Sequence, residues 1–283
     1  PVLSLEFTPD EQYFVSGGED KMAVLWSMTD GEVKRMGPHT TIVRSVAISP
    51  DGKYIATAGP DDLVTKLWDA RGNLIRNLEL RWANEIVFTP DSRSLLVGPL
   101  DKGALSYDLE GKLLRTYTNS ASPVTSVGFS PFSPDSLFLV TGGEGKHLRL
   151  WDAVTGDAAP LTANPGALPG EGAISAPVAF YPNDPVLLIG HAGDSLYLLD
   201  LYSFEEYAYD KPAFSSTSAI AWGGDHFLTS DFNGNVQCWR GNENGELILE
   251  WDKRIPANYV TSLEVAPDGV HFLSAMSRDW IPS

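Results

Sequence analysis

The chain has 283 residues, 43% of them apolar, and its 37 acidic and 20 basic side chains give a net charge of −17. This acidity repels nucleic-acid backbones and anionic lipid and favours basic proteins as partners, although it also simply keeps a large domain in solution. The single cysteine, Cys238, excludes an internal disulfide and a cysteine-rich zinc site. Its strand-like surroundings favour a buried, inert thiol.

Targeting signals are weak in this sequence. No apolar run approaches the length needed to cross a bilayer as a helix, so we expect no membrane insertion. The chain begins with Pro1 rather than Met, so an initiator methionine, a leader or a whole domain could precede it. A cytoplasmic location is the remaining expectation.

A unit of about forty residues recurs along the chain, and periods of this length indicate a repeat architecture. The clearest copy covers residues 43–78, where Ser49-Pro50-Asp51-Gly52 has the signature of a type I turn after an alternating strand pattern. Turn residues divide this copy into four short predicted strands, over 43–49, 53–59, 63–68 and 73–78. Each unit is therefore expected to form a four-stranded antiparallel sheet.

Sheets of this kind have two faces to bury and two edges to protect, and radial stacking around an axis covers the faces of all of them. The sequence therefore predicts an all-β fold, a β-propeller of four-stranded antiparallel blades. Seven first strands can be counted, which predicts seven blades, the last of them incomplete. A single domain is expected over 1–283, with approximate blades at 1–37, 38–79, 80–118, 119–162, 172–211, 215–251 and 257–283 and a loop insertion over 157–176.

Particular residues give this repeat a family resemblance. An aromatic or apolar residue recurs in one phase, at Trp26, Trp68, Tyr107, Trp151, Leu199 and Trp239. The run Ser16-Gly17-Gly18-Glu19-Asp20 precedes Trp26, and Thr141-Gly142-Gly143 precedes Leu150-Trp151-Asp152. Both segments resemble blades of the WD-repeat β-propeller family, and the resemblance extends over essentially the whole chain.

The resemblance implies a hydrogen-bonded structural set in each blade. It consists of a His before the first strand, a Ser or Thr at the end of the second, an Asp in the next turn and the Trp of the third. The matching residues are Ser16, Asp20 and Trp26; His39, Asp62 and Trp68; Thr141 and Trp151; and Trp239. Ala58 stands where the second unit should have its hydroxyl, and Gly145 replaces the Asp of the fourth, so no complete set is expected.

Ring closure in this family usually places a strand from one terminus into a blade built by the other. The seventh unit has at most the beginning of a third strand after residue 277, and Pro1 begins directly at a first strand. Either the last blade is partial, or strands outside this sequence complete it. The second alternative is favoured, because an open ring would leave pairing edges exposed.

Catalysis has no positive support in the sequence. The five histidines fall in different units without metal-ligand spacing, and no nucleophile elbow, Walker loop or dinucleotide fingerprint is present. We therefore expect no enzyme activity, metal or cofactor. The resemblance implies a protein-binding scaffold in a complex, or the ligand-sensing module of a larger chain. The alternative is a subunit of an enzyme or redox complex whose cofactor lies outside this segment.

Candidate partner-binding residues fall in two kinds of loop. The turns between second and third strands should share one face, the top, and would make it acidic through Glu19, Asp61 and Glu144. Connections between blades add residue types that dominate interface hot spots, namely Arg81, Trp82, Phe214, Phe232 and Tyr259. The same aromatic residues could instead pack between blades. The expected partners are proteins, with basic proteins favoured by the charge, and the chain is expected to form part of a larger assembly.

Overall fold

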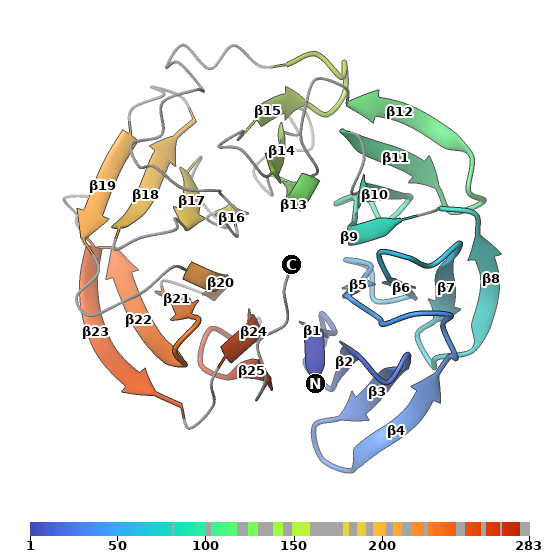
Figure 1. Ribbon diagram of the computed structural model, residues 1–283, viewed down its shortest axis with the longest axis horizontal. Coiled ribbons are helices and arrows are strands. Elements are labelled where there is room, and N and C mark those ends of the chain that lie inside the picture. The colour runs from blue at the N-terminus through green and yellow to red at the C-terminus, as the bar shows by residue number, and fades with distance from the viewer. Residues whose placement is uncertain are drawn as a thin grey trace.

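The computed structural model describes residues 1–80, 82–99, 103–117, 124–129, 138–143, 149–158, 178–180, 186–190, 195–201, 206–210, 217–223, 226–241, 247–255, 259–266 and 268–277. Every regular element in these ranges is a β-strand. The sheets are arranged radially in a disc, with the first strand of each sheet nearest the centre (Figure 1). The prediction of an all-β propeller with four-stranded antiparallel blades is therefore confirmed.

The first three blades each have four antiparallel strands that pair in chain order. Blade 1 contains β1 (Val2–Phe7), β2 (Tyr13–Gly18), β3 (Ala23–Ser27) and β4 (Gly31–Met36). Blade 2 contains β5 (Ser45–Ile48), β6 (Tyr54–Ala58), β7 (Thr65–Asp69) and β8 (Leu74–Leu78). Blade 3 contains β9 (Ala83–Phe88), β10 (Ser94–Pro99), β11 (Ala104–Asp108) and β12 (Leu113–Tyr117).

The next three blades continue the same order around the ring. Blade 4 has three described strands, β13 (Val124–Phe129), β14 (Phe138–Gly143) and β15 (Arg149–Asp152). Blade 5 contains β16 (Val178–Phe180), β17 (Val186–Gly190), β18 (Ser195–Asp200) and β19 (Glu206–Asp210). Blade 6 contains β20 (Thr217–Gly223), β21 (His226–Asp231), β22 (Asn235–Gly241) and β23 (Leu247–Arg254).

The predicted number of seven blades is wrong. The described residues form six blades, and the remaining strands, β24 (Tyr259–Val265) and β25 (Phe272–Ser277), form only a two-stranded sheet. Counting first strands therefore overstated the number of blades, because β24 begins a sheet that has no described third or fourth strand.

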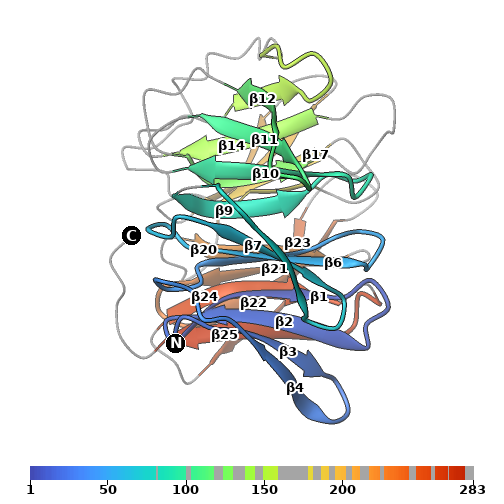
Figure 2. The ribbon, with the colours of Figure 1, turned by 90° about the vertical axis from the view of Figure 1, so that its right-hand side faces the viewer.

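The hydrophobic core lies between neighbouring blades, because successive side chains of a strand point to opposite faces of its sheet. Leu67 and Leu78 of blade 2 pack with Ile86 and Leu95 of blade 3. On the other face of blade 2, Trp68 packs in a cluster with Val15, Leu25 and Met36 of blade 1. Figure 2 shows the stacked blades from the side. Each blade is thus buried on both faces, as the radial arrangement requires.

The innermost strands of neighbouring blades belong to separate sheets. Hydrogen bonds from their side chains connect one blade to the next. Ile48 N–H donates to Glu6 Oε2 at 3.0 Å, and Val127 N–H donates to Glu85 Oε2 at 2.7 Å. Thr261 Oγ1 of β24 donates to the carbonyl of Val2 at 2.7 Å. The two-stranded sheet is thereby tied to blade 1, which completes the ring of sheets seen in Figure 1.

Burial raises the pKa of the glutamate carboxyl groups on these inner strands. It raises the pKa of Glu85 to about 7, against the opposing effects of the Val127 N–H and of Arg44. Burial also raises the pKa of Glu264, on β24, to about 8. The pKa of Glu6 lies well above its usual value because of burial and, secondly, repulsion by Glu264. Glu6 and Glu264 therefore interact across the boundary between the last sheet and the first blade.

Candidate functional site

In blades 1 and 2, the turn after the second strand lies beside the connection to the next blade, on what we call the top face. Backbone hydrogen bonds join these loops. His39 N–H donates to the carbonyl of Lys21 at 2.9 Å, and Val43 N–H donates to that of Gly18 at 2.9 Å. The connection from blade 1 to blade 2 is thus fixed against the β2–β3 turn.

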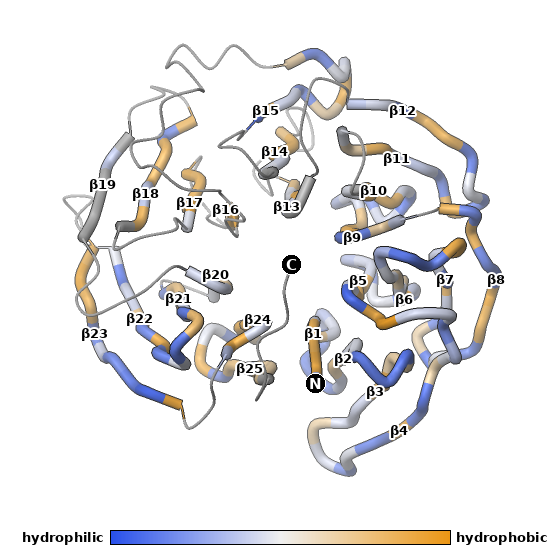
Figure 3. Tube along the Cα trace, in the orientation of Figure 1, coloured by the Kyte–Doolittle hydropathy of each residue, from blue (hydrophilic) through white to orange (hydrophobic). Residues whose placement is uncertain are grey.

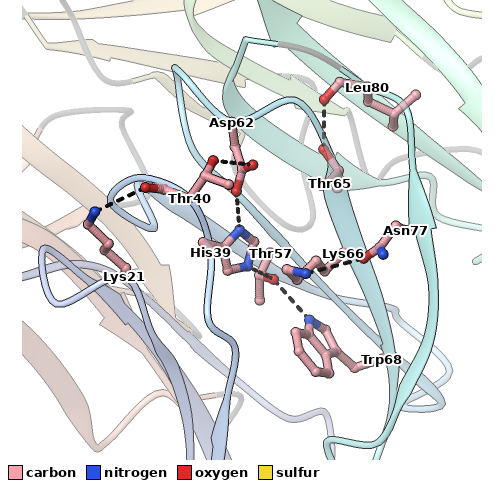
Figure 4. A network of polar contacts seen from close by, with 10 residues as sticks. All are labelled: Lys21, His39, Thr40, Thr57, Asp62, Thr65, Lys66, Trp68, Asn77 and Leu80. Carbon is pink, nitrogen blue, oxygen red and sulfur yellow. Dashed lines mark hydrogen bonds and ion pairs between the residues drawn. The ribbon is translucent and has the colours of Figure 1, made fainter.

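A buried chain of hydrogen bonds supports the top face in blade 2 (Figure 4). Trp68 Nε1 donates to Thr57 Oγ1 at 2.9 Å, and Thr57 Oγ1 lies 2.7 Å from His39 Nε2. His39 Nδ1 lies 2.6 Å from Asp62 Oδ2, and Thr40 Oγ1 donates to Asp62 Oδ1 at 2.7 Å. One proton arrangement satisfies every group: Thr57 donates to a neutral His39, which donates to the Asp62 carboxylate.

The expectation that no blade has a complete structural set is wrong for blade 2. Its hydroxyl belongs to Thr57, one residue before the Ala58 that the alignment with Ser16-Gly17-Gly18 had placed there. Trp68 pairs with Ile55 across the sheet, so the side chain two residues beyond Ile55 is on the same face. That side chain is Thr57, whereas Ala58 points to the opposite face.

Three other blades have the same Trp–hydroxyl pair. Trp26 Nε1 donates to Ser16 Oγ at 2.8 Å, and Trp151 Nε1 donates to Thr141 Oγ1 at 3.1 Å. In blade 6, Trp239 Nε1 donates to Thr229 Oγ1 at 3.0 Å. Sequence analysis missed Thr229, although its position ten residues before Trp239 matches that of Ser16 before Trp26.

Asp20 lies apart from the Ser16–Trp26 pair. Its carboxylate accepts the N–H of Met22 at 3.3 Å and lies 3.6 Å from Arg35 Nη1, with more than half of the side chain exposed. The predicted structural role of Asp20 is therefore limited in this structure to its own turn and to an exposed ion pair.

The sequence of groups in blade 2, hydroxyl, imidazole and carboxylate, is the same as in a hydrolytic triad, but its environment differs. Thr57, His39 and Asp62 have exposed fractions of 0%, 3% and 1%. Burial is the largest cause that lowers the pKa of His39. Burial opposes ionisation of Asp62, yet hydrogen bonds from Thr40 and His39 lower its pKa. Because the Thr57 oxygen already accepts from Trp68 and does not reach solvent, this network is structural.

Trp82 lies on the top face, directly beside the buried network. Its N–H donates to the carbonyl of Asp62 at 3.3 Å, and its backbone adopts φ 57°, which is uncommon for a residue with a side chain. The Trp82 side chain is 45% exposed, and that of Leu63, the residue after Asp62, is 55% exposed. Asp61 is exposed in the same turn. An aromatic, an aliphatic and an acidic side chain are thus presented together.

Sequence analysis did not single out Leu63. An apolar residue that follows Pro60-Asp61-Asp62 in a turn is the only signal that could have pointed to it.

The other predicted partner-binding residues are distributed around the ring. Phe232, in the β21–β22 turn, and Tyr259, at the start of β24, make an edge-to-face contact with ring centroids 6.3 Å apart. Phe232 is exposed and Tyr259 half-buried. Glu19 is half-buried, and its N–H donates to the carbonyl of Pro1 at 3.1 Å. Arg81, Glu144 and Phe214 lie outside the described residues.

Two further histidines in the described part of the chain lie beside carboxylates. His226 Nε2 lies 3.0 Å from Glu250 Oε2, and Arg240 Nε lies 3.1 Å from Glu250 Oε1. His271 Nδ1 lies 2.6 Å from Asp268 Oδ2. No group of three or more His, Cys, Asp or Glu side chains that could hold a metal ion occurs in the described ranges. Within the same ranges there is also no helix long and apolar enough to span a membrane.

Comparison with known proteins gives both family and fold matches. Residues 1–27, 31–69 and 111–152 match the family described as "WD domain, G-beta repeat". Nuclear distribution protein PAC1-1 of Uncinocarpus reesii is 30% identical over 156 residues, covering 46% of this chain and 34% of that protein. Serine-threonine kinase receptor-associated protein of Mus musculus is 24% identical over 200 residues, covering 55% of this chain and 56% of that protein.

The chain spans between 34% and 56% of the length of the first curated relatives. Among solved structures, "Structure of U3-55K" superposes with a TM-score of 0.81 at 17% identity, covering 98% of this chain and 89% of that one. At this identity the likeness concerns the fold alone.

Proposed function

The chain belongs to the WD-repeat β-propeller family, and on that premise we propose that it is a non-catalytic platform for protein binding within a larger assembly. The surface that would bind a partner is the part of the top face formed by Asp61, Leu63 and Trp82.

The conformation of Trp82 is the observation that carries this proposal. Trp is among the residues that dominate binding energy at interfaces, and a side chain that is already ordered loses less entropy on binding. The Trp82 N–H is held by the carbonyl of Asp62. The carboxylate of Asp62 is in turn fixed by the buried His39 and Thr40. The buried network thus supports the backbone segment that carries the exposed Trp82 side chain.

Charge supports a basic partner for this surface. Asp61 is exposed beside Trp82, and Glu19 lies on the same face of the neighbouring blade. The whole chain has a net charge of −17, which would accelerate the approach of a basic protein at low salt. The mouse relative is named for its association with a kinase receptor, and this name supports a role in assembly.

Affinity purification followed by reconstitution tests the proposal. The complete protein and its Trp82→Asn variant are each used to capture partners from the cells that make it, and the captured protein is then purified and titrated against both. We expect Trp82→Asn to weaken this binding by roughly tenfold or more, since loss of a central aromatic anchor typically costs about 2 kcal/mol or more. Val270→Ser is the matched control, because Val270 is also apolar and exposed but lies between β24 and β25.

Two results would contradict the proposal. One is equal affinity of the wild type, Trp82→Asn and Val270→Ser proteins for every partner recovered. The other is a stoichiometric cofactor in the absorbance spectrum or metal analysis of the purified protein, which would favour the enzyme-subunit alternative. Charge reversal by Asp61→Lys tests the basic nature of the partner: binding should weaken most at low salt.

A further inference from the structure

The outermost strands of blades 1, 2 and 3 share one irregularity, a β-bulge at the same place. In blade 2, Trp68 pairs with Leu74 and Leu67 pairs with Arg76, so that Ile75 is the extra, unpaired residue. The same displacement leaves Val33 unpaired in β4 and Leu114 unpaired in β12. A bulge re-aims side chains at the edge of a sheet, here at the circumference of the disc.

The bulged residues are apolar and exposed. Val33, Ile75 and Leu114 have exposed fractions of 50%, 43% and 51%. Leu74 and Leu113, which precede two of them, are also exposed. Figure 3 shows the apolar stretches that β8 and β12 place at the outer edge of the ring. An aliphatic side chain repeated at one position in three consecutive blades is a pattern rather than a scatter of single exposed residues.

A basic residue follows each bulged residue in the sequence. Lys34 pairs with Leu25, Arg76 with Leu67 and Arg115 with Ser106. These three partners occupy equivalent positions in the third strands, one residue before Trp26, Trp68 and Tyr107. The outer edge of the first three blades therefore repeats an aliphatic side chain beside a cation.

Each of the three cations contacts the blade that follows its own. Lys34 Nζ donates to Asn73 Oδ1 at 2.5 Å, from β4 to the turn before β8. Arg76 Nη1 lies 4.0 Å from Glu110 Oε1, from β8 to the turn before β12. Arg115 donates to the carbonyl of Thr155, next to the exposed Val154. We call this surface the apolar rim, defined by Val33, Leu74, Ile75, Leu113, Leu114 and Val154.

Blade 6 differs from blades 1 to 3 at the equivalent position. In blade 6 the bulged residue of the outermost strand is Glu250, because Trp239 pairs with Leu249 and Cys238 with Trp251. The Glu250 carboxylate contacts His226 and Arg240 within its own blade. At the equivalent position, blades 1 to 3 have an aliphatic residue beside a cation, whereas blade 6 has an acid that already contacts basic side chains.

We propose that the apolar rim binds an acidic segment of another protein. Aliphatic side chains of the bound segment would contact Val33, Ile75 and Leu114. Carboxylates of the same segment would pair with Lys34, Arg76 and Arg115. An acidic partner follows from charge, since Arg76 is exposed and Lys34 and Arg115 are half-buried along an otherwise acidic chain. Addition of a strand to the sheet edge is disfavoured because the bulges interrupt the ladder there.

This inference extends the proposed platform function to a second surface of opposite charge, and the two can fail separately because they use different residues. The probe is a labelled synthetic peptide of repeated Glu-Leu-Ser triplets, titrated by fluorescence anisotropy against the complete protein. We expect saturable binding that weakens as salt increases. The triple variant Lys34→Glu, Arg76→Glu, Arg115→Glu should weaken it by roughly tenfold or more.

The aliphatic part of the site is tested by the triple variant Val33→Ser, Ile75→Ser, Leu114→Ser, which should also weaken binding by roughly tenfold. All six residues are at least partly exposed, so both variants should keep the melting temperature of the wild type. The matched control Ile248→Ser, exposed on β23, should bind the peptide as the wild type does.

Three results would overturn the inference. The first is no binding of the acidic peptide, or binding no tighter than that of a peptide with Lys in place of Glu. The second is an affinity that both triple variants leave unchanged. The third is concentration-dependent dimerisation that the serine variant abolishes, because the apolar rim would then be occupied by a second copy of the chain.

Discussion

The hydroxyl of Thr57 lies 2.7 Å from Nε2 of His39, in a blade where alignment of the repeats places the hydroxyl position at Ala58. Thr57 is the central member of the buried network, because it also accepts the indole N–H of Trp68. Removal of its hydroxyl leaves one unpaired group on each side.

We therefore expect Thr57→Val to lower the free energy of unfolding by about 2–4 kcal/mol, since an unsatisfied buried polar group costs about 1–3 kcal/mol. Thr229→Val in blade 6 should cost less, because the described partner of Thr229 is Trp239 alone, without a histidine. Thr116→Val, at an exposed position of β12, is the control. Urea denaturation measures all three, and an equal cost for Thr57→Val and Thr229→Val would contradict the role given to His39.

Gly59 follows the second strand of blade 2, where the chain before β5 passes close by. A Cβ at this position would lie 2.0 Å from the carbonyl oxygen of Ile42, and a backbone atom cannot rotate away as a side chain can. We expect Gly59→Ala to cost about 1–3 kcal/mol or more, as overpacking does. Gly241→Ala is the matched control, since a Cβ there meets nothing within 4 Å. Similar thermal stability of the two variants would show that no such close approach exists.

The carboxyl of Glu264 gives stability a definite pH dependence. Burial raises its pKa from 4.5 to about 8, so the folded protein retains a proton that the unfolded chain has released. The contribution of this group to stability therefore falls as pH rises from about 4.5 to about 8. Glu264→Gln removes that loss and also the repulsion of Glu6. We expect the variant to gain stability relative to the wild type across this interval.

Urea denaturation at a series of pH values measures this difference. The exposed Glu79→Gln substitution is the control for loss of one negative charge. A constant difference between Glu264→Gln and the wild type from acidic to mildly alkaline pH would contradict the prediction.

Trp82 combines an exposed side chain with φ 57°, a conformation that Asn adopts more readily than Trp. Trp82→Asn should therefore leave the melting temperature unchanged or slightly higher, by an effect of about 1 kcal/mol at most. A large loss of stability, measured by thermal unfolding, would show that the indole packs against the protein. In that case a loss of partner binding by this variant could not be assigned to the interface.

Features of the fold could be predicted where the sequence pattern lies within one repeat unit, and could not where they depend on how the strands pair. The repeated turns and tryptophans predict four-stranded blades because each unit contains its own pattern. The position of Thr57 was missed because the local runs Thr57-Ala58-Gly59 and Ser16-Gly17-Gly18 can be aligned in two ways. Only the pairing of Trp68 with Ile55 decides between them.

The site was less predictable than the fold. Residue type alone singles out Trp82, but its conformation depends on the carbonyl of Asp62, which precedes β7 and β8 in the chain whereas Trp82 follows them. The apolar rim could not be predicted, because one extra residue in a hairpin is indistinguishable in sequence from a slightly longer turn. The bulge at Ile75 is visible only once the strands are paired.

The carboxylates that join innermost strands have a consequence for the way the ring opens. Glu6 and Glu85 accept from the Ile48 and Val127 amides of the next blade, and Ser4 and Ser45 likewise accept from the Val46 and Ile86 amides. These bonds are isolated, whereas the strands within a blade are joined by continuous ladders. We therefore expect neighbouring blades to separate at one boundary while each sheet remains paired. Hydrogen exchange at these amides would measure the breathing of single boundaries, on a faster timescale than exchange within the blades.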